Sequence, residues 1–300
     1  MKFSIFQESR KGGRKANQDR IGYAYTRDAL LTVVADGMGG HLHGEVASQI
    51  TVQYLTEAFQ RDAKLKLADP PDFLRKGIRE AHFALADYAK ARGLSESPRT
   101  TCVACVVQDS IAHWAHVGDS RLYHVRRGQV QAQTRDHSRV QVLIDRGRIR
   151  EEAVAAHPDR NKIFNCIGAA TPPEVELSQQ VPLQQGDTLL LCTDGLWGPL
   201  TRKLITAALL TGDIMKAMPE LLNLAEARAG KDSDNLSVVA VAWEEESADV
   251  NTVPAPDLDG VTTQREDFSK AQDSELTDEE VDIAIAEIRE AIRKHLQPKP

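Results

Sequence analysis

Two apolar runs of this chain each end in an Asp-Gly pair, and this repeated pattern constrains the fold more than any other feature. The acidic residues of the two pairs are Asp36 and Asp194. A third acid, Asp234, comes just before another apolar run, residues 236–243. Apolar runs of this length and β-branched content are typical of buried strands. Because such strands pack in one core, the pattern predicts carboxylates that project from one end of it.

The rest of the chain alternates between strand-like runs and helical periodicity. We expect strands at residues 30–35, 101–107, 111–117, 121–125, 187–193 and 236–243. The three runs within 101–125 have very short, turn-like connections and predict an antiparallel meander. We expect helices at residues 45–60, 73–91, 138–147 and 204–229. Strands interrupted by long helices predict an α+β fold, a layered sandwich with its helices outside.

Composition places the chain among ordinary globular proteins. It has 300 residues, of which 41% are hydrophobic and 27% are charged. It contains no run of about 18 apolar residues, the length that a membrane-spanning helix needs. The N-terminal residues lack the apolar stretch of a secretory signal. We therefore expect a cytoplasmic protein with no membrane association.

The formal net charge of −7 is concentrated in the last segment, after a nearly neutral body. A nucleic-acid partner is not expected, because no basic face is apparent. The composition divides the chain into a body, residues 1–244, an acidic and disordered linker, residues 245–275, and an amphipathic helix, residues 276–297. The apolar stripe of this helix would pack on its own body, on a second copy or on a partner.

Four cysteines are present, and two of them form a C-x-x-C at Cys102 and Cys105. A zinc site would need a second pair with similar spacing, and Cys166 and Cys192 are far apart. A redox pair would sit at the start of a helix, whereas TTCVACVV reads as a strand. We expect four buried, reduced thiols.

Six aspartates stand at expected strand ends or in tight turns: Asp19, Asp36, Asp119, Asp136, Asp194 and Asp234. Each one alone suits turn formation or helix capping. Carboxylates that crowd at one end of a core repel one another unless a cation neutralises them. Oxygen ligands without a nearby His or Cys grouping favour Mg²⁺ or Mn²⁺ over zinc. The sequence therefore predicts a divalent-cation site in which one bound water can act as a nucleophile.

The order of the motifs RKANQD, VADGMGGHLHGEVAS, HVGDSRLY, TRDHS, CTDGLW and DSDNLSVV resembles that of the bacterial PP2C-type (PPM family) phosphatases. The resemblance spans about residues 4–243, and the combination of motifs makes it specific. It implies a four-layer α-β-β-α sandwich of two antiparallel sheets flanked by helices, which forms a catalytic domain over residues 1–244. It also implies metal ions in a cleft at one end of the sandwich.

The resemblance assigns metal ligands motif by motif. Asp36 matches the carboxylate that bridges two central metal ions, and Gly37 matches a backbone carbonyl ligand of one of them. Asp194 and Asp234 match the other two central acids. Asp136 matches the acid of a third, weaker site. The cofactor implied is Mn²⁺ or Mg²⁺.

Two further residues are assigned in the same way, and one is set aside. Asp19 matches an outer acid that hydrogen-bonds metal-bound waters. Arg14 matches the arginine that grips the substrate phosphate, although its position alone would suit a solvated charge; an arginine fork fits two phosphate oxygens. Asp119 lies in an expected hairpin turn, and we expect it to be structural.

The chain departs from the family pattern at two places. Arg99 stands where a glycine is frequent, and it either crowds the start of a strand or lies near the cleft. Met38 stands where eukaryotic members carry a histidine that is proposed as general acid. His41 or His43 could replace that histidine, and His41 is the one that we expect to act. The proton for the leaving group would come from His41 or from a metal-bound water.

These features together predict an enzyme, a metal-dependent protein phosphatase that hydrolyses phosphoserine and phosphothreonine by a metal-activated water. Its partners would be phosphoproteins and a cognate Ser/Thr kinase whose action it opposes. The alternatives on the same fold are a catalytically weak phosphoprotein-binding module and a partner-switching regulator.

Overall fold

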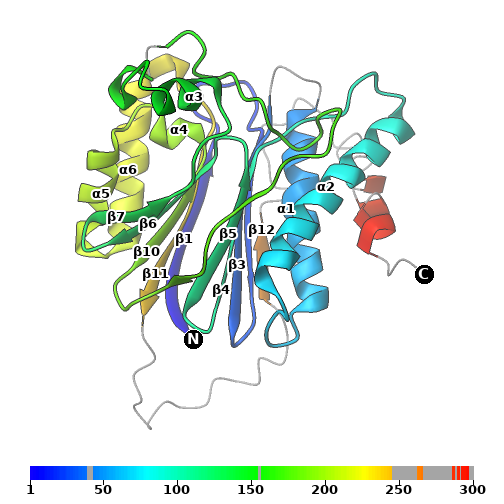
Figure 1. Cartoon of the computed structure of the whole chain (residues 1–300), viewed down its shortest axis with the longest axis horizontal. Coiled ribbons are helices and arrows are strands. Elements are labelled where there is room, and N and C mark those ends of the chain that lie inside the picture. Colours follow the sequence, from blue (N-terminus) through cyan, green and yellow to red (C-terminus); the bar gives the residue numbers. More distant parts are fainter. Residues whose placement is uncertain are drawn as a thin grey trace.

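The computed structural model describes residues 1–38, 43–154, 157–244, 262–265 and, near the C-terminus, residues 286, 287, 289, 290 and 292–296. Two antiparallel sheets lie against each other, and helices cover the outer side of each (Figure 1). The expected four-layer α+β sandwich is confirmed.

The first sheet has five strands, and strands from the N-terminal and C-terminal parts of the body lie side by side in it. Their order is β1 (Lys2–Arg10), β11 (Leu236–Glu244), β10 (Thr188–Cys192), β6 (Arg121–Arg126) and β7 (Gln129–Gln133). All neighbours are antiparallel. The sheet thus places the last strand of the body beside the first.

The second sheet holds the strand that leads into Asp36. Its order is β12 (Thr262–Arg265), β2 (Asp19–Tyr25), β3 (Ala29–Asp36), β4 (Cys102–Gln108), β5 (Ile111–Val117) and β8 (Glu176–Leu177), and β9 (Val181–Pro182) also pairs with β5. Its pairs are antiparallel as well. The expected strands at 30–35, 101–107 and 111–117 all lie here.

The helices form the two outer layers. Helices α1 (Gly44–Asp62) and α2 (Pro70–Arg92) pack against the second sheet, and α4 (Asp194–Trp197), α5 (Arg202–Ala208) and α6 (Ile214–Ala229) pack against the first. The shorter elements are α3 (Arg139–Asp145), η1 (Glu151–Ala153), η2 (Leu209–Thr211) and η3 (Gly230–Asp232). Local sequence signals set both ends of α2. The Asp69 side chain caps its N-terminus by accepting from the Asp72 N–H, and Gly93 ends it in a left-handed conformation.

Alternation along the strands divides the core into layers. In β3, Leu31 and Val33 face α1 and α2, whereas Leu30 and Val34 face the first sheet. Successive side chains of a strand point to opposite faces, so a strand that is apolar throughout can serve two apolar layers. A third apolar layer lies between the first sheet and α4, α5 and α6.

The expected meander of 101–125 is wrong in its second half. Strands β4 and β5 pair, but β6 joins the other sheet beside β10. The chain changes sheets at Gly118, whose φ of 102° favours glycine and whose Cα approaches the side chain of Thr101 so closely that a Cβ would lie 2.6 Å from its methyl group. The turn that looked like a hairpin therefore spans the two sheets.

Part of the acidic tail lies on the body. Within the segment expected to be a disordered linker, β12 pairs with the edge of β2, and the rest of that segment lies outside the described residues. The described residues of the C-terminal helix are helical. Ile292 is fully buried against α1 and α2, and Leu296 packs beside it. Of the three surfaces considered for this helix, the structure shows it on its own body.

All four cysteines are buried and free, as expected. Burial raises the pKa of the thiols of Cys102, Cys105 and Cys192, which makes them poor nucleophiles. Among the described residues, no helix combines the length and apolar character that a membrane crossing requires.

Candidate metal centre

The strand ends bring the expected acids to one end of the sandwich. Asp36 is the last residue of β3 and is paired in register with Asp19, the first residue of β2. Asp194 begins α4 directly after β10, and Asp234 stands before β11, which pairs with β10. Asp19 and Asp119 are buried. The partly exposed acids are Asp36, Asp194 and Asp234. The cluster of carboxylates therefore has a buried side and a side that solvent can reach.

The two sheets are linked directly at this centre. The Thr193 hydroxyl donates a hydrogen bond of 2.9 Å to Asp19 Oδ2 and accepts one of 3.0 Å from the Ser237 N–H. The Thr101 hydroxyl is hydrogen-bonded to the Ser120 hydroxyl at 2.7 Å and also accepts from the Asp36 N–H. Short side chains with hydroxyl groups thus fix the spacing of the acids across the sandwich.

Crowding makes these carboxyls weak acids. Burial, followed by the charges of Asp19 and Asp194, raises the pKa of Asp36 well above its ordinary range. Burial, followed by the charges of Asp119 and Asp234, does the same for Asp194. Burial is the main cause that raises the pKa of Asp19 to about 7. Such shifts are expected where carboxylates converge without a neutralising charge.

Two carboxylate oxygens in this cluster are available to a ligand. Asp19 Oδ1 and Asp194 Oδ1 are buried and have no hydrogen-bond partner within the part of the chain that the structure describes. An unsatisfied buried carboxylate oxygen is costly, so such atoms mark a place for a cation or for water bound to one.

The backbone beside Asp36 is closely packed. A Cβ on Gly37 would lie 2.3 Å from the Gly44 carbonyl oxygen and 2.6 Å from that of Gln18, so only glycine fits there. The Gly37 N–H donates to the Gln18 carbonyl at 3.1 Å. The loop after β3 is thereby held against the start of β2.

Arg14 reaches the same centre from the N-terminal loop. Its guanidinium donates to Asp234 Oδ2 at 2.6 Å, and its side chain is 55% exposed. Asn235 anchors this loop, because its side chain accepts from the Gln18 N–H and donates to the carbonyls of Lys11 and Ala16. The expected phosphate-binding arginine therefore lies at the rim of the carboxylates.

The structure gives Asp136 and Asp119 different surroundings. Both oxygens of Asp136 accept from the Arg121 guanidinium, at 2.9 and 2.8 Å, and the pair is buried. Arg121 in turn stacks 3.7 Å above the Trp197 ring. Asp136 is therefore paired with a buried arginine, and its place in a third metal site stays a prediction.

Asp119, which we expected to be structural, lies close enough to Asp194 for its charge to raise the pKa of that carboxyl. Among the charges around Asp194, that of Asp119 contributes most to the raised pKa of the Asp194 carboxyl. Burial, followed by the charge of Asp136, raises the pKa of Asp119 itself to about 7. The change of sheets at Gly118 brings Asp119 near Asp194. The missed signal is that a Gly-Asp turn after a buried strand need not be a hairpin.

The residues that depart from the family pattern lie beside the centre. The Arg99 carbonyl accepts from the Met38 N–H at 3.0 Å, and its guanidinium pairs with Glu96 at 3.3 Å. Arg99 thus lies next to the loop that follows Asp36 and does not displace the strand. His41 lies outside the described residues, and His43 is the residue before α1.

Comparison with known proteins identifies the family to which this sequence and fold belong. A family model described as "Protein phosphatase 2C" matches residues 7–232. A putative protein phosphatase 2C-type protein of Streptococcus pyogenes is 33% identical over 228 residues, which cover 75% of this chain and 92% of that protein.

Solved structures show the same fold. The serine/threonine phosphatase Stp1 from Staphylococcus aureus matches with a TM-score of 0.74 and 30% identity, over 82% of this chain and 96% of that one. The catalytic domain of the phosphatase PstP, solved in complex with two manganese ions, matches with a TM-score of 0.68 and 30% identity, over 81% of this chain and 99% of that one.

Proposed function

The chain belongs to the protein phosphatase 2C family and is a metal-dependent serine/threonine protein phosphatase, and from this premise we propose which residues perform the reaction. Asp36, Asp194 and Asp234 hold two central ions of Mn²⁺ or Mg²⁺, and the Gly37 carbonyl completes this ligand set. The observation that carries the proposal is the convergence of these acids from three separate stretches of the chain.

The residues present fit such ions. The cluster offers oxygen atoms only, and these are the ligands that Mg²⁺ and Mn²⁺ prefer. The buried, unpaired Oδ1 of Asp194 is a ligand atom in need of a partner. A divalent charge also relieves the mutual repulsion that raises the pKa of Asp36 and Asp194.

For the third, weaker ion we propose Asp119 together with Asp194, in place of Asp136. Asp119 is the strongest charged neighbour of Asp194, whereas the Asp136 carboxylate is fully engaged by Arg121. Because the buried Arg121 already balances the charge of Asp136, a cation would gain less from that carboxylate.

When bound, the ions supply the charge that turns a water into a nucleophile for in-line attack on phosphorus. Arg14 binds the equatorial oxygens of the phosphate, and its contact with Asp234 keeps its guanidinium over the centre. Asp19 is held by Thr193 and orients a water at its unpaired Oδ1. His41 donates a proton to the departing seryl or threonyl oxygen.

The substrates are phosphoproteins, and we propose that the enzyme opposes a cognate Ser/Thr kinase in the cytoplasm. A non-catalytic binding module is not favoured, because relatives with the same fold are named as phosphatases and all the acids proposed for the metal site are present here.

The deciding experiment measures hydrolysis of phosphoserine and phosphothreonine peptides with Mn²⁺ and with a chelator. Asp36→Asn is expected to lower kcat by at least about 100-fold and to weaken Mn²⁺ binding in calorimetry. The matched control is Asp109→Asn, in the β4–β5 turn at the opposite end of the sandwich, where Asp109 pairs with Lys66. Wild-type turnover by Asp36→Asn would refute the assignment.

A further inference from the structure

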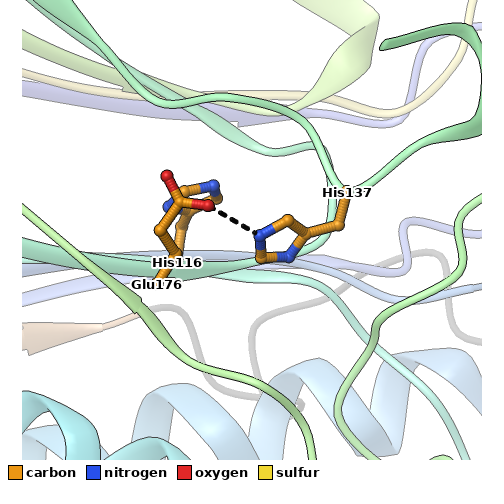
Figure 2. Close-up of side chains that lie close together, drawn as sticks. All are labelled: His116, His137 and Glu176. Atoms are coloured by element: carbon orange, nitrogen blue, oxygen red, sulfur yellow. Dashed lines mark hydrogen bonds and ion pairs between the residues drawn. The ribbon is translucent and has the colours of Figure 1, made fainter. Parts of the chain in front are cut away.

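A second group of polar side chains lies next to the metal centre but outside its acids. His116 on β5, His137 in the loop after β7 and Glu176 on β8 converge, with one potential ligand atom from each within 4.8 Å of the others (Figure 2). His116 and Glu176 are cross-strand partners, and the two imidazole rings stack with centroids 4.7 Å apart. A cation site is the first reading of such a group.

The positions of the protons oppose a cation there. His137 Nδ1 faces two donors, the Gly118 N–H at 3.2 Å and the Asn165 side-chain amide at 2.8 Å. The Asn165 amide cannot be turned around, because it donates to the Glu174 carbonyl and accepts from the Glu174 N–H. His137 Nδ1 must therefore accept, and in the neutral ring the proton resides on Nε2.

The proton on Nε2 is directed at Glu176. His137 Nε2 lies 3.2 Å from Glu176 Oε2, so the N–H donates to the carboxylate (Figure 2). A histidine that binds a metal presents a lone pair to it and donates through its other nitrogen. The only lone pair of His137 is already used by two N–H donors, so the group fixes a tautomer and does not form a metal site.

The fixed tautomer holds the turn that carries Asp119. His137 Nδ1 accepts from the Gly118 N–H, and the His137 N–H donates to the Gly118 carbonyl at 2.9 Å. Both backbone polar groups of Gly118 are thus bound by one residue. On the other side of the turn, Trp197 Nε1 donates to the Asp119 carbonyl at 3.1 Å.

The His137 ring is itself held on several sides. His116 donates from Nε2 to the Arg135 carbonyl at 2.8 Å and stacks on one face of the ring. The ring centroids of Phe164 and His137 are 6.0 Å apart, and the Phe164 N–H donates to the His137 carbonyl at 3.0 Å. His137 therefore joins segment 164–176 to the Gly118–Asp119 turn.

We propose that His137, as the Nε2–H tautomer that Asn165 and Glu176 enforce, is a positioning residue that sets Asp119 for the third divalent ion. This inference rests on the proposed function, because it takes Asp119 to be a ligand of that ion. It adds that the segment containing Asn165 and Glu176 controls the affinity of the centre through one imidazole ring.

Two substitutions of His137 separate this role from simple packing. In His137→Asn the side-chain oxygen occupies the place of Nδ1 and can accept from Gly118, whereas in His137→Gln the polar atoms lie one bond further out, near the place of Nε2. Both remove the ring and its stacking. We expect His137→Gln to weaken the weakest Mn²⁺ binding step by about 10- to 100-fold, and His137→Asn to stay within about 3-fold of wild type.

Asn165→Asp tests the tautomer itself. The new carboxylate oxygen would draw the proton to Nδ1, which would then oppose the Gly118 N–H. Added negative charge alone would strengthen Mn²⁺ binding, so a weakening of about 10-fold or more identifies the change of tautomer. Calorimetric Mn²⁺ titration and long-range ¹H–¹⁵N spectra of the imidazole in the full-length protein provide readouts other than turnover.

The outcomes are distinct. Weak binding in His137→Gln and Asn165→Asp, near-normal binding in His137→Asn and an Nε2–H signal in the wild type support the proposal. Equal binding in the two His137 variants, an Nδ1–H signal in the wild type, or Zn²⁺ bound by His116 and Glu176 in excess Mg²⁺ would overturn it. A wild type that binds no Mn²⁺ at all would instead refute the proposed function.

Discussion

The Thr193 hydroxyl donates to Asp19 Oδ2 at 2.9 Å, and this bond, like that between Thr101 and Ser120, joins the two sheets at the candidate metal centre. Thr193 follows β10 in the first sheet, and Asp19 begins β2 in the second. The same hydroxyl accepts from the Ser237 N–H at 3.0 Å. One threonine thus binds one oxygen of a buried acid and a buried backbone donor together.

Replacement of this hydroxyl should cost stability. Thr193→Val keeps the shape but removes one hydrogen bond from Asp19 Oδ2 and leaves the Ser237 N–H without this acceptor, so we expect a loss of about 1–3 kcal/mol in the free energy of unfolding. Urea denaturation of the metal-free protein measures it. Thr206→Val is the control, because the exposed Thr206 hydroxyl donates only to a carbonyl of its own helix. An equal effect of both changes would contradict the role of Thr193.

Asp136 and Asp119, whose roles we propose to exchange, should respond in opposite ways. Asp136→Asn leaves the buried Arg121 without its counter-charge and is expected to cost about 3 kcal/mol of stability, with little effect on Mn²⁺ affinity. Asp119→Asn removes repulsion from the metal-free centre and is expected to weaken Mn²⁺ binding without loss of stability. Denaturation and calorimetry on both variants decide the matter, and a stronger metal defect in Asp136→Asn would reverse the assignment.

The metal-free protein should lose stability as the pH rises towards neutrality. The pKa of Asp19 and that of Asp119 are raised to about 7, from an ordinary value near 4 in the unfolded chain. Between about pH 4 and pH 7 the native state holds more protons, so each group lowers the free energy of unfolding by up to ~1.4 kcal/mol per pH unit.

Mn²⁺ replaces these protons, so its effect should depend on pH. We expect the rise in Tm on addition of Mn²⁺ to be larger at pH 8 than at pH 5.5, because protons compete with the metal for the same carboxylates. Scanning calorimetry with and without Mn²⁺ at the two pH values measures it. A rise in Tm that is the same at both pH values would show that the ion does not bind at this cluster of acids.

The C-terminal helix should contribute to the stability of the body. Ile292 is fully buried against α1 and α2, and His295 lies between Glu80 at 3.1 Å and Asp87 at 3.0 Å. We expect Ile292→Ala to cost about 2–4 kcal/mol, because a buried isoleucine is replaced by a cavity. The exposed neighbour Lys294 offers Lys294→Ala as control, and indistinguishable unfolding curves for the two variants would place the helix elsewhere in solution.

The sequence by itself determined the layers of the sandwich and three of the acids. The strands that end at Asp36 and Asp194 and the strand that follows Asp234 are apolar throughout, and a strand of that kind has to be covered on both faces. Their local pattern therefore identified both the β layers and the carboxylates at the strand ends. Strand β1 was not identified, although Phe3 and Ile5 alternate with polar residues as in a half-buried strand.

Only the tertiary structure decided which neighbours the remaining residues have. Whether β6 continues one sheet or joins the other depends on how the chain passes Thr101 at Gly118, and that passage brings Asp119 near Asp194. Both oxygens of Asp136 accept from Arg121, a contact that the sequence around Asp136 could not predict. Pairing between sheets is a long-range property, so it could not be derived from the turn residues alone.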